Sequence, residues 1–344
     1  MKDGFLMYKE NTTRVFGAEF FVVAAILALA AGLRTPGFDR DSLQYLAELN
    51  RTFSEIDLSS KEPAFWLLQQ LNLRFFASEY THFFLMFAAC GVSIKLLSIS
   101  ILSKWRVWSV FVYIALFFVM HEMTQIRAGV AIGLVFLSSK FIIERRLSSF
   151  LVLIFLASLF HYSAIVFCFL YFVRSNFNFK IFCAYAALPA LALVVNNLRL
   201  PESLVGGALH ILPEFLSYKI ELYLKMAEAN ELEVVNPLNF GNIAMLFIVL
   251  YAGYMLSLRD KSTIELREHA LYVAFKWNCI GYFILFSLSF IEVFAYRWAS
   301  YMLFPMVVTL PYAFSRLRPK KLGAFVFGAF LIYFGVRSVE ELLS

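Results

Sequence analysis

The sequence predicts an all-α fold, a polytopic transmembrane helix bundle with about ten membrane segments. The chain is 61% hydrophobic and has a mean hydropathy of +0.73. Only 16% of its residues are charged, whereas soluble domains carry about 25%. The apolar residues gather in runs of about 20, the length that crosses a hydrocarbon core of about 30 Å as a helix. Because such runs fill most of the 344 residues, we expect one integral membrane domain, residues 1–344.

Each expected segment is an apolar run bounded by charged or turn-forming residues. The runs are 15–33, 80–103, 107–121, 124–143, 148–172, 178–195, 238–257, 269–291, 293–314 and 322–336. Two longer stretches remain as loops, 34–79 and 196–237. They carry the aromatic stretch Pro63–Phe76 and the amphipathic patch Phe215–Met226. Amphipathic pieces suit the plane of the membrane interface, although plain packing onto the bundle explains each one equally well.

Lysine and arginine cluster in the short turns, which is typical of cytoplasmic turns. With the N-terminus in the cytoplasm, the basic turns at 104–106 and 140–146 fall inside and the loop 34–79 falls outside. If each later run crosses the membrane once, the basic clusters at 259–267 and 316–321 fall outside, which contradicts the same rule. One segment between 147 and 258 must therefore be broken or re-entrant.

Two arrangements restore the orientation. In the first, the run 148–172 is two short helices that turn back near His161 and Tyr162. In the second, a re-entrant segment lies around Val205–Leu216. We favour the first, because it places the loop 196–237 outside with the other outer loops. Irregular backbone at that depth must be buried in protein or line a wet cavity.

Composition excludes several other classes. The net charge of +6 does not indicate nucleic-acid binding, because the basic residues follow the turns and form no basic domain. The four cysteines lie inside apolar runs without a CxxC pair, and the chain has no glycine-rich phosphate loop. We therefore expect no metal and no cofactor.

Polar groups within apolar runs are candidates for function, because burying a charge in a membrane is costly. Arg127 opens the run 124–143; alternatively it snorkels or pairs with Glu122. His161 lies in the middle of the run 148–172, where a satisfied core histidine is the alternative.

Further charges flank or interrupt the apolar runs. Arg297 and Glu292 stand at the start of 293–314 and either pair with each other or serve a site. Glu19, Lys95 and Lys276 have the reach to snorkel, and we interpret them as structural.

The candidate cations Arg34, Arg127, Arg297 and His161 all belong to the expected outer side. Asp41 and Glu62 lie near Arg34 in the sequence. The planar fork of arginine matches phosphate oxygens, and such donors neutralise a departing diphosphate. A carboxylate can take the proton from an attacking sugar hydroxyl. The set fits glycosyl transfer, but an anion transporter would show similar cations.

Five short motifs then follow one another in a consistent order from Arg34 to Tyr301. They are Asp41-Ser42-Leu43-Gln44-Tyr45, Glu62-Pro63-Ala64-Phe65-Trp66-Leu67-Leu68, Gln125-Ile126-Arg127-Ala128-Gly129-Val130-Ala131-Ile132-Gly133, Leu156-Ala157-Ser158-Leu159-Phe160-His161-Tyr162-Ser163-Ala164 and Arg297-Trp298-Ala299-Ser300-Tyr301. In these motifs the chain resembles the EpsG family, Wzy-like membrane proteins that polymerise exopolysaccharide or O-antigen repeats. One departure is that the family's Gly-Thr-Asp becomes Phe38-Asp39-Arg40-Asp41 here, and of the two acids we favour Asp41.

The resemblance implies a metal-independent glycosyltransferase. Its substrate would be an oligosaccharide linked to a polyprenyl diphosphate such as undecaprenyl diphosphate, at the outer face of a bacterial inner (plasma) membrane. Its partners would be this lipid-linked glycan and membrane lipid. A chain-length regulator is a further possible partner, and nucleic acid is not expected to bind. The implied catalytic residues are Asp41, Glu62, Arg127 and His161. The implied substrate-binding residues are Arg34, Tyr45, Gln125, Tyr162, Arg297 and Tyr301.

Two other functions remain open at this point. A ligase-type glycosyltransferase would use the same donor but add its glycan once, so its product would not form a ladder. A flippase or transporter of the lipid-linked oligosaccharide would carry similar cations. Transporters often contain inverted repeats, and the sequence shows no such symmetry.

Overall fold

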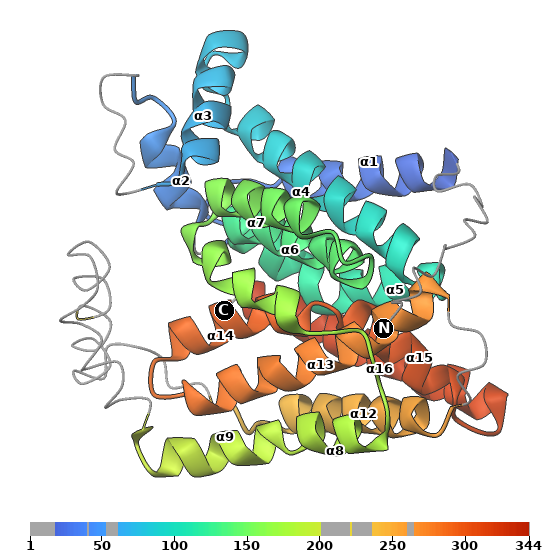
Figure 1. The fold of residues 1–344 in the computed structure, drawn as a ribbon. Coiled ribbons are helices and arrows are strands. Elements are labelled where there is room, and N and C mark those ends of the chain that lie inside the picture. Colours follow the sequence, from blue (N-terminus) through green and yellow to red (C-terminus); the bar gives the residue numbers. More distant parts are fainter. Residues whose placement is uncertain are drawn as a thin grey trace.

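The computed structural model describes residues 18–39, 41–52, 61–200, 221, 236–259 and 265–343. These residues form helices and connecting turns, with no β-strand among them. Figure 1 shows most of the helices stacked side by side along one direction. In chain order they are α1 Ala18–Gly32, α2 Ser42–Glu48, α3 Pro63–Phe76, α4 Tyr80–Leu102, α5 Arg106–Tyr113, η2 Ile114–Thr124, α6 Ile126–Ile143, α7 Leu147–Phe160, η3 Tyr162–Phe172, α8 Phe179–Ala186, α9 Leu188–Asn197, α12 Phe240–Ser257, α13 Leu266–Ser287, α14 Glu292–Leu303, α15 Met306–Ser315 and α16 Lys320–Leu343.

The predicted all-α membrane architecture is confirmed. Seven described helical segments are long and apolar enough to cross a membrane, and four shorter apolar helices accompany them. Three of the ten expected runs lack a helix of spanning length, because 148–172 and 293–314 are broken and α1 has only 15 described residues. The run 293–314, for instance, divides into α14 and α15 at Phe304–Pro305, where proline lacks the N–H that a continuing helix needs.

The centre of the bundle consists of α4, α6 and α13, most of whose side chains are buried. Helix α6 packs against α4 on one side and α7 on the other, and α13 packs against α9 and α14. By contrast, α8, α9 and α16 keep large apolar side chains exposed, Phe179, Leu193, Phe325 and Ile332 among them. Apolar side chains on an outer helix surface are expected where lipid is the solvent.

The run 148–172 turns back on itself, as the first of the two expected arrangements requires. Helix α7 ends at Phe160, His161 is extended at φ −154° and ψ 114°, and η3 begins at Tyr162 as a 3₁₀-helix. The ring of Phe150, near the start of α7, lies 5.4 Å from that of Tyr171, near the end of η3. The entry and exit of this hairpin therefore lie at the same end of the bundle, and His161 lies at its tip.

Basic connections from distant parts of the chain meet at the entry end of the hairpin, which we call the basic end. Arg267 donates to the carbonyls of Ser100 and Ile101 at 3.4 Å, and Trp105 contacts the ring of Tyr312 at 5.6 Å between centroids. This grouping is the one that the positive-inside pattern predicts for a cytoplasmic face. Both stretches proposed for the second arrangement, Val205–Leu216 and Phe215–Met226, lie outside the described residues.

The opposite end carries α2 and α3, which form part of the predicted loop 34–79 (Figure 1). Helix α3 coincides with the aromatic stretch Pro63–Phe76, which was expected to be part of a loop rather than a helix. It begins at Pro63, because proline suits the first turn. It ends at Ala77, whose left-handed φ of 52° closes the last turn onto the carbonyl of Asn72. The proline start places Glu62 directly before the helix, at its N-cap position.

Candidate functional site

Glu62 joins two residues that come from other parts of the bundle. Its carboxylate oxygen Oε1 lies 2.7 Å from Nδ1 of His161, and its Oε2 forms an ion pair with the guanidinium of Arg127. Glu62 is only 4% exposed. Three segments therefore converge here: the start of α3, the first turn of α6 and the tip of the α7–η3 hairpin.

The electrostatics of Glu62 follow from these two partners. Burial alone would raise the pKa of its carboxyl. The hydrogen bond from His161 and the charge of Arg127 outweigh burial and lower the pKa from 4.5 to about 2. Glu62 is thus a firmly ionised carboxylate with both oxygens engaged, which suits it to positioning its neighbours better than to accepting a proton.

Arg127 is placed by a break between two helices. The π-helix η2 ends at Thr124, Gln125 takes φ −92° and ψ 56°, and α6 begins at Ile126. The connection between the expected runs 107–121 and 124–143 is therefore a single non-helical residue. The Arg127 guanidinium lies 5.9 Å from the ring centroids of Tyr45 and Phe65. Its Nε is buried without a hydrogen-bond partner among the described residues.

The alternative pairing of Arg127 with Glu122 is wrong, because Glu122 forms a buried ion pair with Lys95 instead. Lys95 does not snorkel to either end of α4 and has no exposed surface. Lys95 therefore takes part in an ion pair inside the bundle rather than reaching the membrane interface.

His161 presents one ring nitrogen to Glu62 and keeps the other clear of it. When Nδ1 donates to the Glu62 carboxylate, the lone pair resides on Nε2. The side chain is 20% exposed, so Nε2 remains able to meet a ligand. The alternative that His161 is a core histidine with both nitrogens hydrogen-bonded explains Nδ1, which contacts Glu62, but not Nε2.

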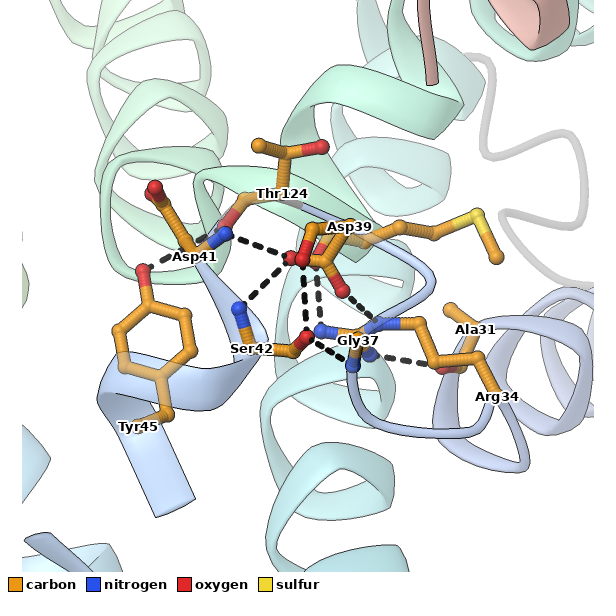
Figure 2. Close-up of polar contacts among 9 residues, drawn as sticks. Ala31, Arg34, Gly37, Asp39, Asp41, Ser42, Tyr45 and Thr124 are labelled. Carbon is orange, nitrogen blue, oxygen red and sulfur yellow. Dashed lines mark hydrogen bonds and ion pairs between the residues drawn. The ribbon is translucent and has the colours of Figure 1, made fainter. Parts of the chain in front are cut away.

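Arg34 and Asp39 build a turn beside the site (Figure 2). The Nε of Arg34 donates to Oδ2 of Asp39 at 2.9 Å, and its other nitrogens donate to the carbonyls of Ala31 at 2.8 Å and Met123 at 2.5 Å. The guanidinium also lies 4.0 Å from the ring centroid of Phe84. The hydrogen bonds of the buried Arg34 thus connect α1 and the end of η2 to the turn.

Asp39 uses both carboxylate oxygens within that turn. Its Oδ1 accepts the backbone N–H groups of Asp41 at 3.1 Å and Ser42 at 2.9 Å, while Oδ2 holds Arg34. Gly37 permits the turn with a φ of +87° and donates to the Ser42 hydroxyl at 2.8 Å. Asp39 is therefore fully engaged in local structure.

The carboxylate of Asp41 points out of this network (Figure 2) and makes no hydrogen bond with any residue that the structure describes. Burial raises its pKa above the ordinary 3.8, and the positive charge of Arg297 opposes the rise. The charges of Arg127 and Lys61 act on it in the same sense as Arg297. Asp41 is thus a weakly solvated carboxylate facing several cations.

Two tyrosines line the same region as neutral phenols. Tyr45 is buried beneath Arg127, and its hydroxyl lies 3.4 Å from the carbonyl of Thr124. Burial raises the pKa of Tyr45 to about 12, although the charge of Arg127 opposes the rise. Tyr301 is fully buried, and its hydroxyl accepts from Ser163 at 3.5 Å.

The remaining expected residues surround this centre. Arg297 is half-buried in α14 and forms no hydrogen bond or ion pair with the residues described here, but its charge reaches Asp41. Gln125 has a buried Oε1 without a hydrogen-bond partner in the same part of the chain. Tyr162 is 38% exposed beside His161. In the described ranges, no group of three or more His, Cys, Asp or Glu side chains is placed to hold a metal ion.

Comparison with known proteins rests on a single match. The sequence model of the EpsG family matches residues 18–339, which is nearly the whole chain and includes every residue of the site. The chain belongs to the EpsG family. Neither the curated proteins nor the solved structures give a match. The EpsG family is one of Wzy-like polymerases, so a polysaccharide polymerase-like function follows for this member at that level.

Sequence reasoning overlooked one cation of this EpsG-family site. Lys61 lies 5.8 Å from the ring centroid of Tyr45, measured from Nζ, and its charge acts on Asp41. Its position directly before Glu62 was the available signal. Lys61 was passed over because a lysine in a loop is ordinarily a solvated surface charge.

Proposed function

We propose that this EpsG-family protein is a glycosyltransferase that joins polyprenyl-diphosphate-linked oligosaccharide repeats into a polysaccharide. The observation that carries the proposal is the convergence of Glu62, Arg127 and His161 with the free carboxylate of Asp41 at one end of the bundle. This end combines anion-binding groups with a proton acceptor, and the reaction needs both.

The cations account for the leaving group. The Arg127 side chain is 20% exposed, and Arg297 has no described partner, so both can offer donors to diphosphate oxygens. A diphosphate gains negative charge as its bond to the sugar breaks, and preorganised donors stabilise that charge. His161 adds Nε2 as a further contact. Arg34 contributes indirectly, because its nitrogens hold the Asp39 turn.

Asp41 is the proton acceptor in this proposal. The acceptor sugar hydroxyl attacks the anomeric carbon of the donor glycan and loses its proton to the Asp41 carboxylate. The bond between the anomeric carbon and the diphosphate oxygen breaks, and the diphosphate keeps the electron pair. A raised pKa makes Asp41 a stronger base than an ordinary aspartate, whereas the low pKa of Glu62 makes that carboxylate a poor one.

The arrangement of charges supports an outward-facing site in a bacterial inner membrane. Basic turns gather at the end opposite Glu62, as cytoplasmic turns do. Lipid-linked repeats presented at the outer face would then meet the site directly. Membrane lipid covers the exposed apolar surface.

The decisive experiment measures surface glycan length in a strain lacking this gene. The strain is complemented with wild type, with Arg127→Ala, or with Arg259→Gln, a control at the basic end, at matched membrane levels. We expect a ladder from wild type and the control, and only single repeats from Arg127→Ala. Single additions by the wild type would indicate a ligase. Loss of lipid-linked repeats from the outer face in the deletion strain would indicate a flippase.

A further inference from the structure

A second buried ionic centre lies next to the site, within the helices rather than at their ends. Lys95 of α4 forms an ion pair with Glu122 of η2, and neither side chain has more than 1% of its surface exposed. The Tyr113 hydroxyl donates to the same Glu122 oxygen at 2.8 Å. Lys95 also donates to the carbonyl of Gly129, in α6, at 2.7 Å. The centre therefore links α4, the α5–η2 segment and the first turns of α6.

Two glycines allow this centre to form. A Cβ added at Gly91 would lie 2.2 Å from Oε2 of Glu122, so only glycine leaves room for that carboxylate against α4. A Cβ added at Gly129 would lie 2.0 Å from the carbonyl oxygen of His121, so only glycine lets η2 approach α6 this closely. The backbones of all three elements are thus shaped around the ion pair.

The centre encloses the helix break that presents Arg127. Glu122 lies on the π-helical side of Gln125, Gly129 lies on the α-helical side, and Lys95 binds both. Arg127 stands between these two anchoring points. A π-helix has poorer packing than an α-helix and marks functional positions in many proteins, so it persists where surrounding contacts hold it.

We propose that Lys95 and Glu122 are positioning residues that fix the direction of the Arg127 side chain. The inference rests on the proposed function and extends it to two residues that touch neither diphosphate nor sugar. A purely structural pair would serve only to hold the helices together. The two roles differ in their consequences, because well-packed apolar residues can replace a buried ion pair without loss of stability.

The test replaces the whole centre by apolar residues of similar size, Lys95→Met with Tyr113→Phe and Glu122→Met. The tyrosine is included because its hydroxyl would otherwise lose its acceptor. We expect thermal stability in detergent to equal or exceed that of wild type. Turnover of a synthetic polyprenyl-diphosphate-linked repeat should fall about 10- to 100-fold with KM nearly unchanged, since a misplacement of about 1 Å costs rates of this order. The matched control, Arg259→Gln with Glu268→Gln, removes an ion pair at the basic end and should leave turnover unchanged.

A stable triple variant with wild-type turnover overturns the inference. Should the triple variant fail to fold, Glu122→Asp decides. Aspartate keeps the negative charge, but its side chain is shorter by one methylene. Reduced turnover at near-wild-type stability would support the positioning role, and unchanged turnover would refute it. If wild type itself does not polymerise, the proposed function fails separately. In that case the inference is tested by the rate at which a dicarbonyl reagent labels Arg127. This rate should differ between the triple variant and wild type only if Lys95 and Glu122 position the Arg127 side chain.

Discussion

The Nδ1 of His161 lies 2.7 Å from Oε1 of Glu62, although 99 positions separate the two residues in the chain. The contact exists because the α7–η3 hairpin carries His161 across the bundle to the start of α3. The same carboxylate holds Arg127. A loop, a hairpin tip and a helix start are therefore joined through one side chain.

Replacing Glu62 by glutamine should destabilise the fold in a pH-dependent way. The folded pKa of about 2 lies below the ordinary 4.5, so ionised Glu62 contributes stability above pH 4.5 that is lost as the pH falls towards 2. The full contribution is on the order of 3 kcal/mol. Thermal unfolding should show a lower Tm for Glu62→Gln than for wild type at pH 7, with the gap narrowing in acid. Glu144→Gln, a control at the basic end, should unfold like wild type; a Glu62 variant that does the same would contradict the electrostatic account.

Replacing Asp41 by asparagine should reduce activity while raising stability. Removal of a general base costs about 10²- to 10⁴-fold in rate. Because burial raises the folded pKa of Asp41 above 3.8, its stabilising contribution is present at low pH and is lost as the pH rises through the folded pKa. The neutral amide avoids that loss, so the Tm of Asp41→Asn should exceed that of wild type at pH 7. The wild-type rate should also fall in acid with a midpoint above pH 3.8. Asp39→Asn is the contrast, since it weakens the Arg34 pair and should lower the Tm.

Arg34 and Arg297 should respond differently to the same substitution. Arg34→Gln leaves the buried carboxylate of Asp39 unpaired, which costs about 3–5 kcal/mol, and should reduce the yield of folded protein. Arg297→Gln breaks no ion pair with a described residue, so it should cost much less stability than Arg34→Gln, yet lower activity. The pair of unfolding curves and turnover rates checks this. Equal loss of stability in both variants would argue that Arg297 is structural.

Gly91→Ala tests the close approach of Glu122 to α4. The added Cβ would meet the carboxylate at 2.2 Å, so we expect a loss of about 1–3 kcal/mol from overpacking. Gly328→Ala is the matched control, because a Cβ there meets nothing within 4 Å and helix propensity should stabilise it by up to about 1 kcal/mol. Chemical denaturation of the two variants gives the comparison. A Gly91 variant as stable as the Gly328 variant would show that the carboxylate moves freely.

The sequence predicted the features that follow from run length and charge. The break at His161 followed from basic turns that a straight 148–172 helix would have placed on the wrong side. Helix α3, by contrast, lies within a stretch that was expected to be a loop. The expected membrane topology also placed the candidate cations of the site on the same, outer side of the bundle. These are properties of local sequence or of counting, which need no knowledge of packing.

Pairings between helices were beyond sequence reasoning. Nothing in the chain distinguishes Lys95 from Arg127 as the partner of Glu122, because the choice depends on the register between α4 and η2. Likewise, both Asp39 and Asp41 follow Gly37 closely, and only the turn geometry shows that Asp39 binds Arg34. The π-helical form of Ile114–Thr124 has no compositional mark, since its residues would equally suit an α-helix.

The hairpin that carries His161 imposes a constraint on insertions and deletions. The hairpin enters and leaves the bundle at the same end. A change in the length of both arms would therefore leave the orientation of the following helices unchanged. One added turn in α7 would nevertheless displace His161 by about 5.4 Å, far outside the reach of Glu62. The outward face of α7, with Leu151 and Phe155 exposed, can exchange one apolar residue for another. In this segment the number of residues matters more than their identity.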